Sequence, residues 1–292
     1  MLGIQTKTDA DKIIDAAISR VGEIATLPEV TVRIINIVEN PRSTARDLHD
    51  VIRNDPALSA RLLKVVNSAF YGLPGQIASV DRSIVLLGLS AVKNIAIAAS
   101  MTHLFDGGGS IAGVSGVEIW RHALAVAVAS RLLTAAQGRP TVEESFLAGL
   151  IHDLGLLVER QVFPKQIAEV IVRQKAGSRP FCLLEIEIIG ADHQAFGMAL
   201  AAKWRFPRTL CTAIGYHHKP FDLAETNREL PALLGAADIL ACACGVGFCA
   251  TASGAQLDDD LLRIIKLTPG DIDAVTRELP EQIGLAESIF TE

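Results

Sequence analysis

Histidines and carboxylates gather in the second part of this 292-residue chain. Residues 149–155 read GLIHDLG, so His152 and Asp153 stand side by side in an apolar run that we predict to be helical. Burying two ionisable groups costs about several kcal/mol unless a partner satisfies them. That partner could be a metal ion, each other, or a hydrogen-bond network without metal.

Five of the seven histidines lie beyond residue 116, each near a carboxylate or another histidine. Neutral imidazole and carboxylate bind Fe, Mn, Zn or Ni, which makes a divalent metal the candidate cofactor. Helices of a bundle can bring such ligands together around one or two ions. The candidate ligands are Glu118, His122, His152, Asp153, His193, His217, His218 and Asp238.

Each candidate also has a simpler interpretation. A lone buried histidine is more often hydrogen-bonded than metal-bound, and Asp192 can cap a helix that starts at His193. His217 and His218 can end a helix, where positive charge is favoured. We favour a shared polar centre because all the simpler interpretations would have to hold at once. Metal occupancy stays open at this stage.

Basic residues that could hold a substrate phosphate are sparse. Arg121 and Lys219 are the weak candidates, with Lys203 and Arg205 behind them, and solvent-exposed surface is the simpler interpretation of all four. The chain contains no Gly-rich phosphate loop and no GxSxG nucleophile motif.

The composition predicts an all-α protein. Half of the residues are hydrophobic but only 5% are aromatic, so the core must be aliphatic, as in packed helices. Helical periodicity follows residues that can cap a helix. The predicted caps are Ser43, Asp55 before Pro56, Ser79, Ser90, and Thr141 with Glu144 in capping-box spacing.

A glycine-rich stretch divides the chain. Residues 106–116 read DGGGSIAGVSG, which predicts a linker between an N-terminal helical lobe, 1–105, and a C-terminal helical lobe, 117–292. The tail, about 257–292, is amphipathic. It could form a docking or homodimer surface, although packing on its own core is the plainer interpretation.

Charge and hydropathy limit the partners. The net charge of −6 gives no general attraction to nucleic acid. The apolar run 230–250 contains Asp238, so we interpret it as a buried core helix and expect no membrane span. The N-terminal residues show no signal region, which favours a cytoplasmic location. The five cysteines are expected to be reduced, and a soft-metal or redox site at Cys242 and Cys244 is the less favoured alternative.

The order of these residues resembles the HD superfamily of metal-dependent phosphohydrolases. His122, then His152 and Asp153, then Asp238 match its ligand order. His193, His217 and His218 lie where the binuclear HD-GYP cyclic-dinucleotide phosphodiesterases carry further ligands, and Glu118 where they can place a carboxylate. Residues 219–222 read KPFD, so the Gly-Tyr-Pro element is absent.

A narrower resemblance covers roughly residues 20–240. The stretches LPEVTVRIINIVENPRSTARDLHDVIRNDPALSARLLKVVNSAFYG, SVDRSIVLLGLSAVKNIAIA, GLIHDLGLLV and GADHQAFGMALAAKWRFP are similar to the HDOD domain of bacterial signalling proteins. The resemblance implies a two-lobed helical bundle with an HD-like C-terminal lobe. It also implies a regulatory role through a signalling protein partner or a small ligand, with a metal-dependent phosphohydrolase as the alternative.

Overall fold

The structure is a computed structural model that describes residues 7–21, 27–39, 42–105, 109–177 and 179–290. Within these ranges the chain is helical, and its β pairing is limited to an isolated bridge between Ile111 and Val114. The predicted all-α fold is confirmed.

The helices before the glycine-rich stretch are short. They are α1 (Asp9–Arg20), α2 (Glu29–Glu39), α3 (Ala45–Arg53), α4 (Pro56–Val66), α5 (Val80–Leu87), α6 (Leu89–Met101) and the 3₁₀ turn η2 (Thr102–Phe105).

The helices after it include the two longest of the described chain. They are α7 (Gly116–Ala136), α8 (Val142–Ile151), α9 (Leu154–Val162), α10 (Pro164–Lys175), α11 (Phe181–Ile188), α12 (His193–Lys203), α13 (Arg208–Tyr216), η3 (Pro220–Asp222), η4 (Glu225–Asn227), α14 (Glu229–Ala243), α15 (Asp259–Ile265) and α16 (Pro269–Phe290).

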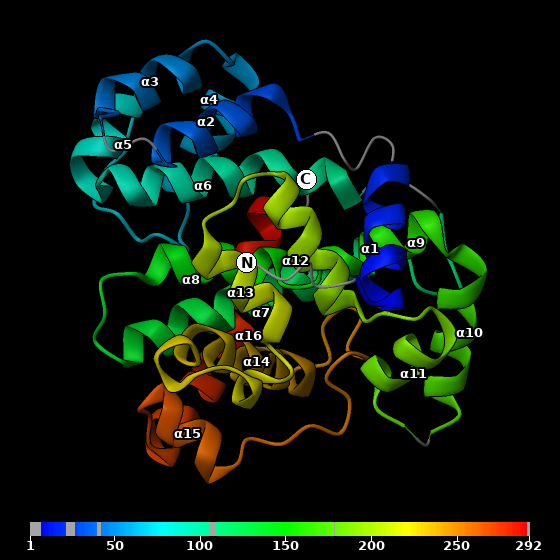
Figure 1. Ribbon diagram of the computed structural model, residues 1–292. Helices are drawn as coiled ribbons and strands as arrows, with labels where there is room; N and C mark the ends of the chain where they lie inside the picture. The colour runs from blue at the N-terminus through cyan, green and yellow to red at the C-terminus, as the bar shows by residue number, and fades with distance from the viewer. Residues whose placement is uncertain (1–6, 22–26, 40–41, 106–108, 178, 291–292) are drawn as a thin grey trace, which may run out of the picture.

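Figure 1 shows α2 to α5 gathered on one side of α6, with the later helices on the other side around α7. Helix α7 is apolar around its whole circumference and packs against α8, α14 and α16, so it forms the axis of the C-terminal bundle. Helix α6 packs on α8 and joins the two groups of helices.

Helix α1 packs against α9 and α12, far from α2 to α5 (Figure 1). The first helix of the chain therefore contacts the bundle that follows the glycine-rich stretch. Residues 106–108 of the predicted linker lie outside the described residues. The rest of that loop is held by Arg160, which donates to the carbonyl oxygens of Gly109 and Val114. The division into lobes at 106–116 stays a prediction.

Some predicted caps form and others do not. Asp55 accepts a hydrogen bond from the Leu58 amide at 2.9 Å, ahead of Pro56 at the first helical position. Ser79 caps α5 and Asp192 caps α12 as predicted.

Three predicted caps are wrong. Thr44, not Ser43, forms the capping box of α3 with Asp47, because its side chain and backbone both reach that residue. Helix α6 begins at Leu89, so Ser90 lies inside it. Thr141 makes no side-chain capping bond, since its backbone is not extended as a side-chain cap requires.

The helix predicted through residues 149–155 is interrupted. Helix α8 ends at Ile151, α9 begins at Leu154, and His152 and Asp153 form the turn between them. Adjacent residues of one helix point about 100° apart. The turn removes this restriction and lets both side chains enter the bundle interior.

Residues 230–243 of the apolar run 230–250 form a buried core helix as predicted, since α14 is enclosed by α7, α13 and α15, whereas residues 244–250 lie in the loop that follows. None of the described helices combines the length and the apolarity needed to cross a bilayer. In the tail, α16 buries Leu279, Ile283 and Phe290, and it packs on α7 and α4. The apolar face of the tail therefore covers the chain's own core.

Candidate metal centre

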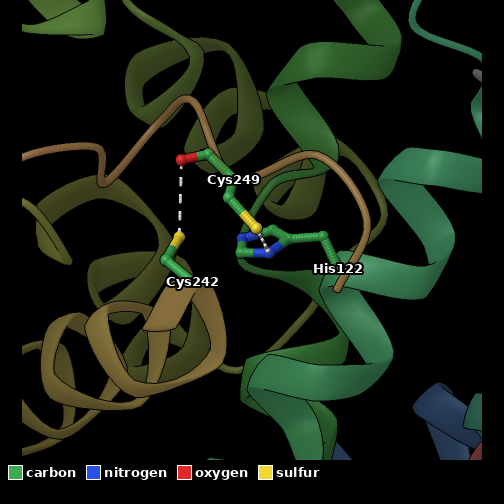
Figure 2. A group of neighbouring side chains, drawn as sticks. All are labelled: His122, Cys242 and Cys249. Atoms are coloured by element: carbon green, nitrogen blue, oxygen red, sulfur yellow. Dashed lines mark hydrogen bonds between the residues drawn. The ribbon is translucent and has the colours of Figure 1, made fainter. Parts of the chain in front are cut away.

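His122 and Asp238 face each other between α7 and α14. Nε2 of His122 lies 3.0 Å from Oδ1 of Asp238, and both side chains are fully buried. Nδ1 of His122 lies on the other side of the ring, 4.0 Å from the Sγ atom of Cys249 (Figure 2). His122, Asp238 and Cys249 thus come from two neighbouring core helices and one loop.

The turn between α8 and α9 brings His152 and Asp153 to the same place. Nε2 of His152 lies 3.3 Å from Oδ2 of Asp153. The rings of His152 and His122 meet edge to face, with centroids 5.4 Å apart. Ligand atoms of His122, His152 and Asp153 lie within 4.8 Å of one another, which is compatible with one bound ion.

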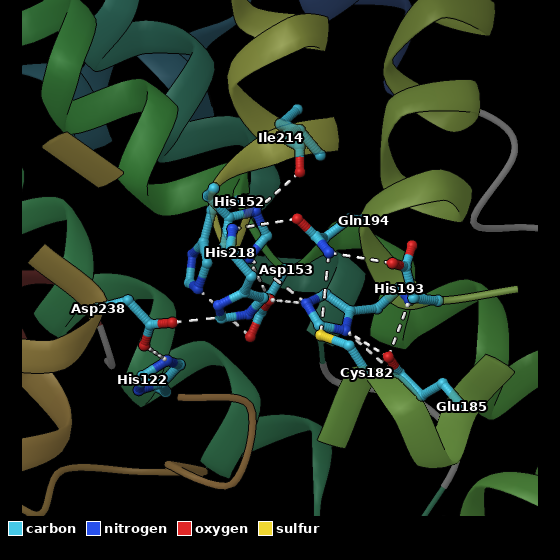
Figure 3. A network of polar contacts seen from close by, with 12 residues as sticks. His122, His152, Asp153, Cys182, Glu185, His193, Gln194, Ile214, His218 and Asp238 are labelled. Carbon is cyan, nitrogen blue, oxygen red and sulfur yellow. Dashed lines mark hydrogen bonds and ion pairs between the residues drawn. The ribbon is translucent and has the colours of Figure 1, made fainter. Parts of the chain in front are cut away.

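His193 lies beside Asp153 (Figure 3), and His217 approaches the same carboxylate. Oδ1 of Asp153 is 3.3 Å from Nε2 of His193 and 3.7 Å from Nε2 of His217. The two Nε2 atoms are 3.4 Å apart. In metal-free protein a proton on His193 can occupy this contact, and when both rings are neutral a cation can take its place.

Hydrogen bonds fix the orientation of these rings. Nδ1 of His152 lies 2.7 Å from the carbonyl oxygen of Gly149, and Nδ1 of His217 lies 2.7 Å from that of Ile214. A carbonyl accepts only, so in both rings Nδ1 carries a proton and Nε2 is directed inward. Metal-binding histidines are oriented in this way.

His193 is oriented by a carboxylate instead. Its Nδ1 donates to Glu185 at 2.8 Å, and its backbone amide reaches the same carboxylate at 3.2 Å. Burial and the adjacent Glu185 charge raise the pKa of Glu159 well above its usual value, so this second buried carboxyl is neutral. Glu185 and Glu159 were not predicted from the sequence, although each is an acidic residue inside an apolar helix.

Several buried atoms of this centre lack a hydrogen-bond partner among the described residues. They are Nε2 of His122, His152 and His218, both carboxylate oxygens of Asp153, and Oδ2 of Asp238. Buried polar groups are almost always satisfied. Their convergence fits one or more cations held by these side chains.

The protonation states also depend on this clustering. Burial alone would lower the pKa of His122, but the Asp238 carboxylate outweighs it and raises the pKa to about 10. For His193, burial is likewise outweighed by the charges of Glu185 and Asp153, and the pKa rises to about 9. Burial would raise the pKa of Asp153, but the charges of His152 and His193 outweigh it and hold the pKa well below its usual value.

His218 lies at the edge of the centre. Its Nε2 is 3.8 Å from Oδ2 of Asp238, and its ring packs against that of His217. Burial lowers the pKa of His218 well below its usual value, so this ring is neutral. Oε1 of Gln194 accepts a hydrogen bond from the backbone amide of His218, which fixes the ring at this position.

The structure brings together all candidate ligands except Glu118. The carboxylate of Glu118 turns outward and lies 3.7 Å from Arg121, which also pairs with Glu287 at 2.7 Å. Lys219 donates to the capping residue Asp192 at 2.8 Å. Both weak phosphate candidates, Arg121 and Lys219, are therefore engaged by carboxylates.

The other two basic residues lie elsewhere. Lys203 donates to the carbonyl oxygen of Ile18 in α1, and Arg205 is exposed after the end of α12.

Fold and centre together define a class: an all-α protein with a buried histidine and aspartate cluster of the HD type. The HDOD domain family matches residues 24–220, and the chain belongs to this family. The family match over residues 24–220 thus confirms the HDOD resemblance that the sequence showed over roughly residues 20–240.

Three solved structures are similar in fold. An HDOD domain protein of unknown function from Geobacter sulfurreducens is 22% identical, with a TM-score of 0.80 over 96% of this chain and 97% of the other. A protein from Shewanella amazonensis SB2B named "Putative phosphohydrolase" is 22% identical, with a TM-score of 0.72 over 95% and 98%. A "Putative signal transduction protein" from Marinobacter aquaeolei VT8 is 24% identical, with a TM-score of 0.74 over 97% and 64%.

One curated relative is an uncharacterized protein from Treponema pallidum (strain Nichols). It is 26% identical over 216 residues, which is 74% of this chain and 41% of the relative. The chain thus spans about two fifths of the length of that relative.

Proposed function

We propose that this chain is a regulatory metal-binding module of the HDOD family, which acts in bacterial signalling through a protein partner or a small ligand. The observation that carries the metal part is the convergence of buried imidazole and carboxylate atoms that form no hydrogen bond and face one another. Ligands of this kind suit Fe, Mn, Zn or Ni.

The set of candidate ligands in the centre is compatible with one or two ions. Asp153 belongs to two groups of candidate ligands, one with His122 and His152 and another with His193 and His217. A carboxylate shared by both groups is suited to bridge two cations. His152 and His217 also form a group with Asp238, so the two groups are continuous.

Enclosure favours regulation over turnover. The side chains of His122, His152, Asp153 and His193 are 0–1% exposed, which leaves little access for a phosphoester. An ion held there would tie α7, the α8–α9 turn, α12, α13 and α14 together. Binding to the folded state alone would stabilise that arrangement by linkage.

Helix α8 offers a route by which occupancy can affect the N-terminal helices. Its end leads into His152, and its first turn carries Glu143, which accepts a hydrogen bond of 2.7 Å from Tyr71. Arg131 of α7 lies over the Phe70 ring at the same junction. A shift of α8 would therefore reach the chain segment after α4.

A cavity beside the contact between α6 and α8 supports the small-ligand half of the proposal. It has a volume of about 1,070 Å³ and is lined by parts of α6, α7, α8, α13 and α14. Asn94 lines it, is 2% exposed, and has an Nδ2 group without a hydrogen-bond partner. Ligand sites are concave in this way, with a few polar groups that fix orientation.

Elemental analysis tests the metal part. Protein expressed anaerobically in metal-replete medium should contain at least one equivalent of a transition metal. The double variant His152→Ala/Asp153→Ala should lose it. Sub-stoichiometric metal in the wild type would contradict the proposal.

A metal-dependent phosphohydrolase is the second candidate function. The observation in its favour is the meeting of His122, His152, Asp153 and Asp238, in the order typical of the HD superfamily. A divalent ion would activate water and offset charge on the phosphoryl oxygens. A panel of phosphoesters and cyclic nucleotides, assayed with Mn or Fe, tests it. Turnover above that of the double variant would favour the enzyme.

We also propose that the chain binds a signalling protein on another chain. Formation of a homodimer is the simplest form of this proposal to test. Light scattering of the purified chain measures the dimer directly, and a monomeric mass would leave a heterologous partner as the proposal. The chain is also proposed to act in the cytoplasm and without nucleic acid.

A further inference from the structure

Two thiols lie at the edge of the candidate centre (Figure 2). Cys242 is in the last turn of α14 and Cys249 in the loop that follows. Their Sγ atoms and a ring nitrogen of His122 lie within 4.8 Å of one another. Cys242 donates to the carbonyl oxygen of Cys249 at 3.5 Å and lies 3.5 Å from Oδ1 of Asp238. The pair therefore contacts two candidate ligands at once.

The loop that carries Cys249 is fixed on α7. The Phe248 amide donates to the carbonyl oxygen of Glu118 at 3.0 Å. Gly247 has a φ of +71°, and a Cβ there would lie 2.4 Å from the backbone nitrogen of His122. Only glycine fits so close to α7 in this conformation. The sulfur of Cys249 is thus held beside the His122 ring.

His122 differs from the other interior histidines in the partner of its Nδ1. His152, His193 and His217 direct Nδ1 at oxygen acceptors. His122 directs Nδ1 at the Cys249 sulfur. Partners of this kind hold a ligating ring in place and are worth about 10–100-fold in metal affinity.

We propose that Cys242 and Cys249 are a redox-reactive dithiol, which a peroxide oxidises to a disulfide, and that this disulfide weakens metal binding through His122. The second half rests on the proposed metal centre. Both thiols are free and partly exposed, so a small peroxide can reach them. Their Sγ atoms lie within 4.8 Å of each other, and a disulfide bond would bring them to about 2.0 Å.

The chemistry is a two-electron oxidation. The sulfur of Cys249 attacks one oxygen of the peroxide, the O–O bond breaks, and a sulfenic acid and hydroxide form. The sulfur of Cys242 then attacks the Cys249 sulfur, so the S–S bond forms and the S–O bond breaks. The two thiol protons convert both hydroxides to water. The disulfide sulfur no longer accepts from Nδ1 of His122 as the thiol sulfur does.

Peptide mapping tests the dithiol. The reduced full chain is treated with hydrogen peroxide, alkylated, digested and analysed by mass spectrometry. A crosslink between Cys242 and Cys249 is expected in the wild type and in the matched control Cys244→Ser, and not in Cys242→Ser. No crosslink, or one that joins Cys244 to Cys249, would overturn the proposal.

Manganese affinity tests the coupling, because Mn²⁺ prefers imidazole and carboxylate to thiolate. Equilibrium dialysis should show about 10–100-fold weaker binding after oxidation. Dithiothreitol should restore the affinity, and Cys242→Ser should not respond to peroxide. In reduced protein, Cys249→Ser should bind more tightly than Cys249→Ala, since its hydroxyl can accept from His122.

The two proposals fail in different ways. A disulfide that leaves Mn²⁺ affinity unchanged would overturn the coupling alone. A reduced wild type that binds no Mn²⁺, Fe²⁺ or Zn²⁺ would overturn the metal centre and the coupling with it, while the peptide map still decides on the dithiol.

Discussion

At the scale of residues, Asp153 joins two groups of candidate ligands in the centre. One carboxylate oxygen faces His152 and the other faces His193 and His217. The proposed ions share this side chain, so loss of its charge should weaken metal binding more than loss of any single histidine.

We therefore expect Asp153→Asn to lower metal content more than His217→Ala does. The amide keeps the size of the side chain but removes the charge, and at least a tenfold loss of affinity is expected, on the order of 1.4 kcal/mol. Elemental analysis after dialysis measures it. Glu118→Gln is the matched control, since that carboxylate faces Arg121, and equal losses in both variants would contradict the assignment.

Metal binding should also release protons. In metal-free protein the pKa values of His122 and His193 are raised to about 10 and about 9, whereas ligation requires neutral rings. Calorimetric titration at about pH 7.5 in buffers of different ionisation enthalpy should therefore show about two protons released. Release of none would contradict the raised pKa values.

The same pKa shifts determine how the stability of the metal-free protein changes with pH. Both pKa values are raised in the folded state above the ordinary value of 6.5. Their stabilising contribution to the metal-free protein is complete below about pH 6.5 and is lost as pH rises through about 9–10. Metal affinity changes in the opposite direction over this window.

At the scale of elements, close contacts between helices hold the ligands in place. Gly155 in α9 lies against His193 in α12, and a Cβ at Gly155 would lie 1.8 Å from the carbonyl oxygen of His193. Helices α9 and α12 can pack this closely only because residue 155 has no side chain.

We expect Gly155→Ala to push α9 from α12 and to displace both Asp153 and His193. The free energy of unfolding should fall by about 3 kcal/mol, and metal affinity should fall with it. Urea unfolding in a chelator measures the first effect. Gly284→Ala in α16 is the control, since no atom lies within 4 Å of its Cβ position, and it should stabilise by up to about 1 kcal/mol.

At the scale of the whole molecule, the proposal requires that the centre and the N-terminal helices be coupled. Tyr71 donates to Glu143 across the junction, and burial raises the pKa of Tyr71 well above its usual value, so the phenol stays a donor.

Tyr71→Phe should cost about 1.5 kcal/mol of stability because Glu143 loses a hydrogen bond. It should leave metal affinity unchanged. Hydrogen exchange should show that metal protects amides of α4 and α6 in the wild type and less so in the variant. Protection confined to α7 to α14 in the wild type would contradict coupling through α8.

The sequence by itself determined the helical class, some of the caps and the candidate ligand types. Asp55 and Ser79 cap their helices because a cap is a contact over three residues, which local sequence specifies. The sequence also shows His122, His152 and Asp238 in order, and their residue types identify them as candidate ligands because few side chains can bind a metal.

Tertiary structure alone decided which of these residues meet. It turned Glu118 outward, broke the helix at His152, and supplied Glu185 and Cys249 as partners of buried histidines. Cys249 and His122 are 127 positions apart. Contacts at such separation depend on how helices pack against each other, and helix packing is set by the fit of whole surfaces rather than by any short stretch of sequence.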